Sequence, residues 1–233
     1  MSGFFKFPST VHLASSSAVS RSDKVMSDAE SRDFLRNNLI GEEKLDGANI
    51  GISKSADGFL RVQNRGNYLS KPFIGQFSRL ASWLDIHRES IDLVLEDDII
   101  LFGEWCAAKH SIGYSSLPDL FFLFDVYDLT RKAFWSVARR DQLALKVGIE
   151  VPPRINVSEM SVKALTNSVN HIVSRFSSAL IEGVVLRHDD LLWNIQRAKV
   201  VRQGFTQSID DHWSKANLTW NRLVDQSSLF PRE

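Results

Sequence analysis

Six short segments rich in β-branched and aromatic residues constrain the fold of this chain most strongly. They are bounded by Gly, Asp or Asn, which is typical of strands separated by turns. Asp57-Gly58 lies between two of them and indicates a hairpin. Because only a few helical patterns separate the segments, we expect an α+β fold of antiparallel sheets flanked by helices rather than a doubly wound parallel sheet. The six segments are residues 48–53, 59–64, 99–105, 120–127, 180–187 and 198–202.

Two longer segments show helical periodicity. Apolar residues follow one helical face within residues 73–84 and again within residues 161–176. Pro72 precedes the first segment, at a position where its missing N–H donor costs little. Shorter helices are expected over residues 28–38 and 139–147, and Gly148 should end the second of these.

The composition excludes several classes of protein. The 233 residues include 28 Lys+Arg and 28 Asp+Glu, and a net charge of zero argues against a protein that coats nucleic acid through bulk positive charge. A single cysteine, Cys106, excludes a disulfide framework and a Cys-rich zinc site. No apolar run approaches the roughly 18 residues that span a bilayer, and the first residues do not resemble a secretory signal. We expect one domain over residues 1–233, located in the cytoplasm and without membrane contact.

The stretch most informative about chemistry is Glu42-Glu43-Lys44-Leu45-Asp46-Gly47-Ala48-Asn49. A lysine becomes a useful nucleophile when burial or nearby cations lower its pKa from the usual value of about 10.4. Gly47 would let the backbone turn or approach a ligand closely. Taken alone, Lys-x-Asp-Gly occurs often by chance and is explained by a surface turn, so other segments must decide whether it is catalytic.

Lys44-Leu45-Asp46-Gly47 resembles the nucleotidyl-acceptor motif of the covalent nucleotidyltransferases, the superfamily of ATP-dependent DNA ligases, RNA ligases and mRNA capping enzymes. Five further segments resemble the other motifs of that superfamily, in the same order along the chain. Asn49, five residues after the lysine, is similar to a feature of the RNA ligase branch. The five segments are Asn64-Arg65-Gly66-Asn67, Phe102-Gly103-Glu104-Trp105, Phe121-Phe122-Leu123-Phe124-Asp125-Val126, Glu182-Gly183-Val184-Val185-Leu186 and Lys199-Val200-Val201-Arg202.

The resemblance implies a nucleotidyltransferase fold, similar to the ATP-grasp fold, with a nucleotide cleft between two sheets. It also implies ATP and Mg²⁺ or Mn²⁺ as cofactors in a three-step reaction. The lysine takes AMP from ATP, AMP passes to a 5′-phosphate of RNA, and a 3′-hydroxyl then displaces AMP. Because every step moves negative charge among phosphate oxygens, catalysis should come from positioning and from cations.

Four residues are expected around the reacting phosphate. The resemblance makes Lys44 the nucleophile, and Asp46 a residue that orients it or binds metal. Lys199 is expected to hold the α-phosphate, and its charge should help lower the pKa of Lys44. The superfamily often has a second lysine two residues further on, where this chain has Val201. Arg202 is the candidate replacement for that cation.

Two carboxylates are expected to bind parts of the nucleotide complex. Glu182 lies in an otherwise apolar segment, where a carboxylate is costly unless it binds a cation or accepts hydrogen bonds. The resemblance assigns it to the divalent metal, and a salt bridge with Arg187 is the alternative. Glu104 is expected to accept hydrogen bonds from the ribose hydroxyls. Arg65 is expected to contact ribose or phosphate.

Adenine recognition is expected from Phe124 and Glu43. The resemblance places a stacking aromatic residue just before Asp125, although core packing also explains the aromatic residues of this strand. Strand alternation would put Phe122 and Phe124 on the same face. Glu43 would accept a hydrogen bond from the adenine amino group and favour ATP over GTP. Asn49 is expected to assist the sealing steps rather than the first step.

The leading hypothesis is an ATP-dependent RNA ligase that joins 5′-phosphate and 3′-hydroxyl ends. About 31 residues follow Arg202, too few for an oligonucleotide-binding barrel, so no such barrel is expected. RNA would meet local cations, and a helper kinase or phosphatase is a candidate partner. The alternatives are a DNA nick-sealing ligase, a nucleotidyltransferase with another acceptor and a non-catalytic nucleotide-binding module. The local cations are Arg187, Arg197, Lys199 and Arg202.

Overall fold

The computed structural model describes residues 4–13, 24–96, 98–157, 161–205 and 218–225. This part of the chain is an α+β fold of two five-stranded, mainly antiparallel sheets, which confirms the expected class. The strands are β1 (Val11–His12), β2 (Ile40–Lys44), β3 (Ala48–Lys54), β4 (Leu60–Gln63), β5 (Ile99–Trp105), β6 (Phe121–Asp128), β7 (Ala133–Phe134), β8 (Arg154–Ile155), β9 (Gly183–Asp189) and β10 (Asn194–Val201). The helices are α1 (Asp28–Leu35), α2 (Leu80–Asp92), α3 (Val137–Val147) and α4 (Val162–Val169), with a 3₁₀ turn over Gly75–Phe77.

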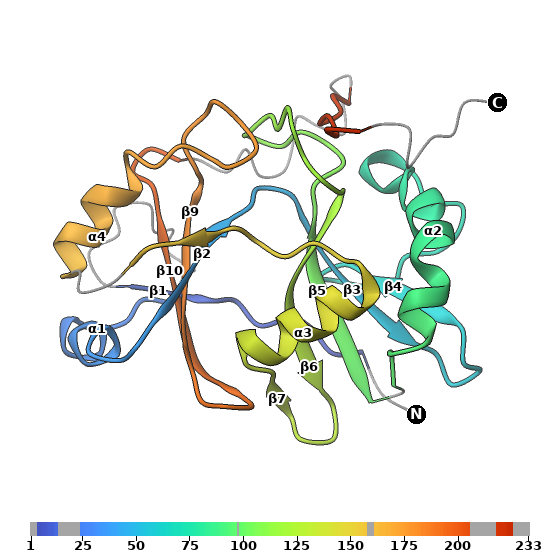
Figure 1. The fold of residues 1–233 in the computed structure, drawn as a ribbon, viewed down its shortest axis with the longest axis horizontal. Coiled ribbons are helices and arrows are strands. Elements are labelled where there is room, and N and C mark those ends of the chain that lie inside the picture. The colour runs from blue at the N-terminus through green and yellow to red at the C-terminus, as the bar shows by residue number, and fades with distance from the viewer. Residues whose placement is uncertain (1–3, 14–23, 97, 158–160, 206–217, 226–233) are drawn as a thin grey trace.

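The first sheet has the strand order β1-β10-β9-β2-β8. Its pairs are antiparallel except for β1, which runs parallel to β10. Helices α1 and α4 lie beside this sheet (Figure 1), and their apolar residues share one buried cluster with one face of β9 and β10. The other face of the sheet carries polar side chains, because the register and the alternation of the strands put Glu42, Lys44, Arg187 and Lys199 on that face.

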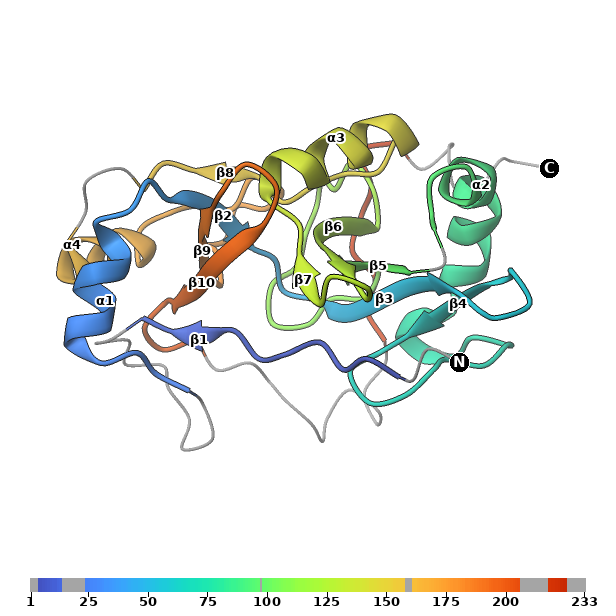
Figure 2. The same cartoon turned by 90° about the horizontal axis from the view of Figure 1, so that it is seen from below.

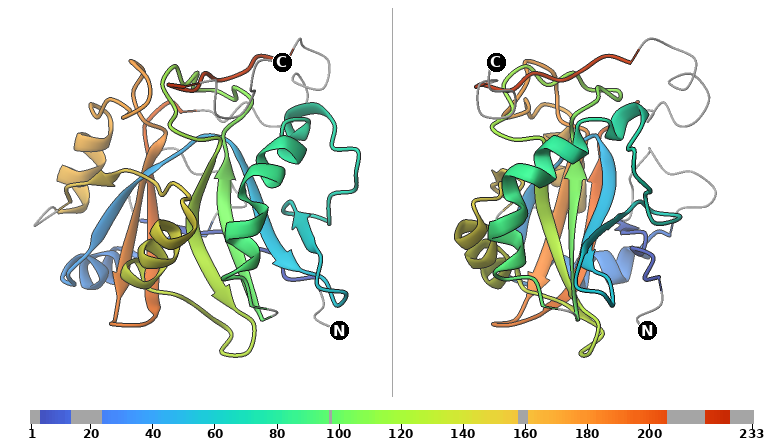
Figure 3. Two further views of the ribbon diagram at one scale, coloured as in Figure 1. Left: turned by 45° about the vertical axis from the view of Figure 1, so that its right-hand side comes forward. Right: turned by 90° about the vertical axis from the view of Figure 1, so that its right-hand side faces the viewer.

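The second sheet has the strand order β4-β3-β5-β6-β7 and is antiparallel throughout. Helices α2 and α3 lie side by side on one of its faces, as Figure 3 shows. Their side chains bury Leu101 and Trp105 of β5 in the largest apolar cluster. The opposite face carries Asn49 and Glu104, which are directly paired across β3 and β5.

The chain crosses from one sheet to the other within the segment that resembles the acceptor motif. Strand β2 ends at Lys44 and β3 begins at Ala48, so only three residues connect the two sheets (Figure 2). The polar face of the first sheet thereby meets the polar face of the second. An ion pair between Arg187 of β9 and Asp125 of β6 joins the two faces directly, with 2.7 Å between Nη1 and Oδ1.

The expected elements occur with shifted bounds. The helix expected from Phe73 begins only at Leu80, because Gly75 has a φ of +57° and a short 3₁₀ turn precedes α2. The helix expected to reach Phe176 ends at Val169. Gly148 ends α3 in the left-handed conformation, as expected. Strand β2 was not expected, since Ile40-Gly41-Glu42-Glu43-Lys44 shows no strand-like alternation, yet it carries the central lysine.

Candidate active site

Lys44 lies at the end of β2 and faces a carboxylate from the start of β9. Its Nζ is 2.6 Å from Oε1 of Glu182, which directly precedes the β9 residue paired with Lys44. The Glu182 side chain is 4% exposed and the Lys44 side chain 23%. The amine is therefore held by a buried partner while part of its side chain stays accessible.

Three carboxylates surround this amine. Burial alone would lower the pKa of Lys44, but the negative charges of Glu182, Glu104 and Asp46 outweigh it and raise the pKa above its usual value. The sequence-based expectation of a lowered pKa at Lys44 is wrong, because these charges act more strongly than burial. The nearby acids outweigh the effect of burial and favour the protonated, ammonium form of Lys44.

Glu104 comes from the second sheet and holds the connection between the sheets. Its Oε1 accepts a hydrogen bond of 3.0 Å from the Gly47 N–H. A Cβ at Gly47 would lie 2.5 Å from the Trp105 carbonyl oxygen, so only glycine allows this approach. Burial raises the pKa of Glu104 to about 7, and the neighbouring Glu182 adds to this while Lys44 and Arg65 act against it.

Replacing Glu104 with glutamine should stabilise the ligand-free protein at alkaline pH. The folded protein resists ionisation of Glu104 between its usual pKa of 4.5 and its value of about 7, so stability is lost as the pH rises through this range. Because glutamine does not ionise, Glu104→Gln should gain up to about 3 kcal/mol over wild type near pH 8 and nothing near pH 4. Urea unfolding at both pH values measures the difference, and a variant destabilised equally at both would contradict the expectation.

Asp46 anchors a loop beside the site. Its Oδ2 accepts hydrogen bonds of 2.7 Å from the backbone N–H groups of Ser111 and Ile112, and its own N–H donates to the Tyr114 hydroxyl at 2.8 Å. Its Oδ1 is buried without a hydrogen-bond partner. His110 lies in the same loop, and its Nε2 is 2.8 Å from Oε1 of Gln76.

The structure brings Lys199 to this group but turns Arg202 elsewhere. Lys199 pairs with Val185 on the face that carries Lys44. Burial raises the pKa of Glu182, and Lys44 and Lys199 both act against that shift. The Arg202 Nε donates to the Ile181 carbonyl at 3.1 Å, and its guanidinium lies over the Phe205 ring.

The two residues expected to bind adenine lie apart from each other. Glu43 points to the other face of β2, where Ser174 Oγ donates to it at 2.6 Å and the Arg175 N–H at 3.1 Å, and burial raises its pKa. The Phe124 ring packs against Phe7 in a small aromatic cluster.

Strand β6 contains a β-bulge at Phe124. The register shifts between Phe102 and Gly103, so Phe124 has no partner on β5, and through Phe7 it packs on the face of β5 that carries Phe102 and Glu104. Phe122 is paired with Glu104 and packs against Phe176, two residues from Ser174. Contacts from Glu43 therefore lead through Ser174 and Phe176 to Phe122 rather than to Phe124.

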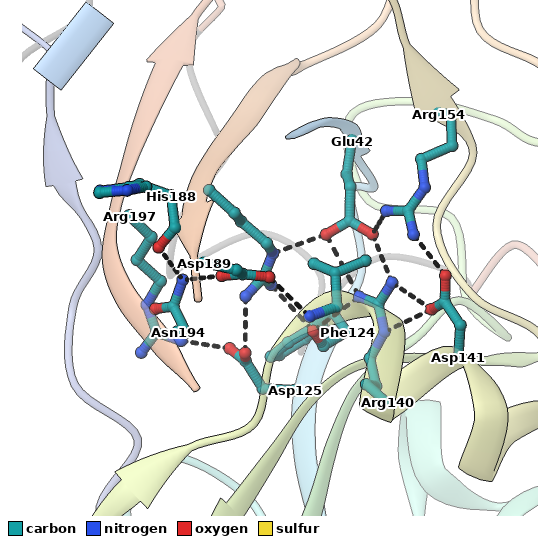
Figure 4. A network of polar contacts seen from close by, with 12 residues as sticks. Glu42, Phe124, Asp125, Arg140, Asp141, Arg154, His188, Asp189, Asn194 and Arg197 are labelled. Atoms are coloured by element: carbon teal, nitrogen blue, oxygen red, sulfur yellow. Dashed lines mark hydrogen bonds and ion pairs between the residues drawn. The ribbon is translucent and has the colours of Figure 1, made fainter. Parts of the chain in front are cut away.

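A buried network of ions joins the two sheets two residues before Lys44 (Figure 4). The Glu42 carboxylate accepts hydrogen bonds of 2.6 Å from Arg140 of α3 and from Arg187, and it also pairs with Arg154. Burial would raise the pKa of Glu42, but Arg140 and Arg187 outweigh it and lower the pKa to about 2.

The network also takes up cations that were expected to contact RNA. Arg187 pairs with both Glu42 and Asp125, so the alternative salt bridge between Arg187 and Glu182 does not form. Arg197 pairs with Asp125 as well, and its side chain is 10% exposed. Of the four expected cations, Arg187 and Arg197 are thus buried partners of carboxylates, and the expectation that these two meet RNA is wrong.

Sequence reasoning missed several residues that support the site. Ser174 and Tyr114 hold Glu43 and Asp46 from distant loops, and nothing local in the sequence indicates this. Arg140 could have been found, because it occupies the apolar face of α3 defined by Val137, Ala144 and Val147. A charged residue on such a face needs a buried partner.

Comparisons with known proteins agree with this arrangement. The family model described as RNA ligase matches residues 37–201. No curated protein matches the chain significantly. Within the described residues, no helix is long and apolar enough to cross a membrane.

Solved structures with a similar fold are RNA ligases of Naegleria gruberi. A lysine-to-methionine variant with AMP and Mn has a TM-score of 0.58 at 15% identity, covering 73% of this chain and 51% of that chain. A lysine-to-alanine variant with ATP and Mn has a TM-score of 0.58 at 14% identity, covering 83% and 58%. The chain thus spans about half the length of the first of these proteins. Since the family model covers most of the sequence, the chain belongs to the RNA ligase family.

Proposed function

We propose that this chain is an ATP-dependent RNA ligase, which joins 5′-phosphate and 3′-hydroxyl ends through a lysyl-AMP intermediate and an adenylylated RNA 5′ end. The observation that carries the proposal is the position of Lys44. Its amine lies where the two sheets meet, 2.6 Å from Glu182 and close to the charges of Glu104 and Asp46. A metal ion that arrived with the phosphate would offset the charge of these acids, and this would lower the pKa of Lys44 toward that of a nucleophile.

In the first step, a bond forms between Lys44 Nζ and the α-phosphorus of ATP, and the bond from that phosphorus to pyrophosphate breaks. The ammonium must lose one proton before it attacks, and the nearest acceptor is Glu182 Oε1. Lys199, on the same sheet face, would hold the α-phosphate as negative charge moves to the leaving pyrophosphate. Arg202 would serve as the second cation only if it left the Ile181 carbonyl.

A divalent metal suits the carboxylate oxygens that lack protein partners. Glu182 Oε2 and Asp46 Oδ1 are both buried without hydrogen bonds, which is costly unless a ligand supplies a partner. Among the described residues, no group of three or more His, Cys, Asp or Glu side chains could hold a metal alone. Glu182 would therefore bind Mg²⁺ or Mn²⁺ together with phosphate and water oxygens, and the ion would neutralise phosphate charge.

The remaining residues would recognise the nucleotide. Glu104 would accept hydrogen bonds from the ribose hydroxyls, and Arg65, whose charge acts on Glu104, would contact ribose or phosphate. Glu43 retains lone pairs for the adenine amino group besides its bonds to Ser174 and Arg175. Phe124 is the proposed stacking residue, and the contact between Phe122 and Phe176 makes Phe122 a second candidate.

Asn49 would act in the two later steps. It is 9% exposed and lies directly opposite Glu104, at the edge of the proposed ribose site. Its side-chain amide could donate a hydrogen bond to the 5′-phosphate that receives AMP.

Paired ligation assays test the proposal. The chain should transfer label from ATP to itself with Mg²⁺ or Mn²⁺, and should seal 5′-phosphate RNA faster than the matched DNA. Sealing of nicked DNA alone would favour the DNA ligase alternative, and transfer of AMP to other acceptors would favour a different nucleotidyltransferase. Absence of label on the protein would favour a non-catalytic nucleotide-binding module.

A further inference from the structure

The geometry points to a second binding site, in which the cleft lined by residues 67–77 holds one nucleotide of the RNA strand beside the end being joined. The inference rests on the proposed function and goes beyond it, because it locates the strand on the surface. It is supported by the charge of this segment, by the lining of the cleft and by the contacts at both ends of the segment.

Charge is distributed unevenly along this neutral chain. Residues 58–84 contain no Asp or Glu, although the whole chain has 28 of them. The same segment contains four cations and several aromatic residues. Cations interleaved with aromatic side chains suit a single-stranded nucleic acid, whose phosphates and bases alternate along the strand. The cations are Arg61, Arg65, Lys71 and Arg79.

The cleft within this segment has the size and lining for one nucleotide. Its volume is about 380 Å³, at the lower end of the range of ligand sites. Tyr68 and Phe73 line it and are only partly buried, and Lys71 at its edge is exposed. The Arg61 guanidinium lies 4.5 Å from the centre of the Tyr68 ring and fixes its orientation. A base could stack on these rings while its phosphate meets Lys71.

Both ends of the segment reach the candidate active site. At one end, Asn64 Oδ1 accepts hydrogen bonds from the Gly66 and Asn67 N–H groups, which fixes the turn that presents Arg65 toward Glu104. At the other end, the carbonyl of the buried Gln76 accepts a hydrogen bond from Trp105 Nε1 at 2.8 Å, and its side chain contacts His110. The segment that lines the cleft is therefore tied at both ends to residues that border the candidate active site.

Another cleft is lined by both lysines and acidic residues, and it supplies a matched control. Lys54 and Lys146 line it, but so do Asp92 and Glu96, so it offers phosphate no net attraction. Lys146 lies on α3 and, like Lys71, is exposed to solvent. Replacing either lysine removes one surface cation, but only the replacement of Lys71 should weaken RNA binding.

The test compares Lys71→Ala, Tyr68→Leu, Tyr68→Phe and Lys146→Ala in the full chain. Binding of a fluorescent 5′-phosphate RNA is measured by anisotropy across salt concentrations, and self-labelling from ATP is measured in parallel. Lys71→Ala should weaken RNA binding several-fold and reduce the salt slope of log Kd by about 0.7 to 0.9. Tyr68→Leu should weaken it about tenfold, and Tyr68→Phe should restore it. All variants should label from ATP at the wild-type rate.

The outcomes separate this inference from the proposed function. If wild type labels itself and seals RNA but Lys71→Ala binds RNA with unchanged affinity and salt slope, the cleft is not an RNA site and the ligase proposal stands. The same conclusion follows if Lys146→Ala weakens binding as much as Lys71→Ala does. If wild type takes no label from ATP, the proposed function itself fails.

Discussion

Lys44→Ala should acquire no label from radioactive ATP, whereas wild type should carry one acid-labile AMP. The variant lacks the amine that forms the bond to the α-phosphorus, and Lys199, the other lysine whose charge acts on Glu182, is proposed to hold the phosphate rather than to attack it. Removing a nucleophile of this kind should lower the rate by at least about 10³-fold. Denaturing electrophoresis after incubation with ATP and Mg²⁺ measures the label directly.

Lys44→Arg is the matched control for this variant. Its guanidinium keeps a positive charge beside the buried carboxylate of Glu182. Guanidinium is not deprotonated in proteins and is a poor nucleophile, so Lys44→Arg should fold normally and still take no label. Covalent label of normal intensity on either variant would show that another residue carries AMP.

Glu42→Gln should destabilise the protein by about 3 kcal/mol at neutral pH. Glu42 is 1% exposed and faces Arg140, Arg154 and Arg187, so loss of its charge removes a carboxylate partner from buried guanidinium groups. The shift of its pKa from 4.5 to about 2 corresponds to a similar free energy. Because the folded pKa is lowered, this contribution is complete above pH 4.5 and is lost as the pH falls toward 2.

Urea unfolding at pH 7 and near pH 3 measures both parts of this prediction. The gap between wild type and Glu42→Gln should shrink markedly at the lower pH. Asp33→Asn serves as the control, because the pair of Asp33 with Arg36 is 72% and 78% exposed and should contribute less than about 1 kcal/mol. A loss for Glu42→Gln no larger than for Asp33→Asn would show that the network does not hold the sheets together.

Local patterns allowed much of the fold to be predicted. Strand β5 was expected with its observed bounds, and the hairpin at Asp57-Gly58 joins β3 to β4 as expected. Strand β2 was missed because its side chains are polar on both faces, and each polar group is satisfied by a residue far away in the sequence. Such a strand has no apolar alternation for a sequence pattern to detect.

The candidate site was likewise predicted only in part. Lys44, Glu104, Glu182 and Asp46 were all expected near one another, and their charges do interact. The direction of the pKa shift at Lys44 was predicted wrongly, because it depends on which charges lie closest in space. The adenine side was also difficult, since the β-bulge in β6 changes which aromatic ring lies beside Glu104.

Peptide mapping of the adenylylated protein shows directly whether Lys44 carries AMP. Wild-type chain incubated with ATP and Mg²⁺ is digested under alkaline conditions that preserve the phosphoramidate bond, and the peptides are sequenced by mass spectrometry. We expect one AMP on the peptide that contains Lys44, attached to the lysine side chain. AMP on a different residue, or a fully active ligase that never carries AMP, would contradict it.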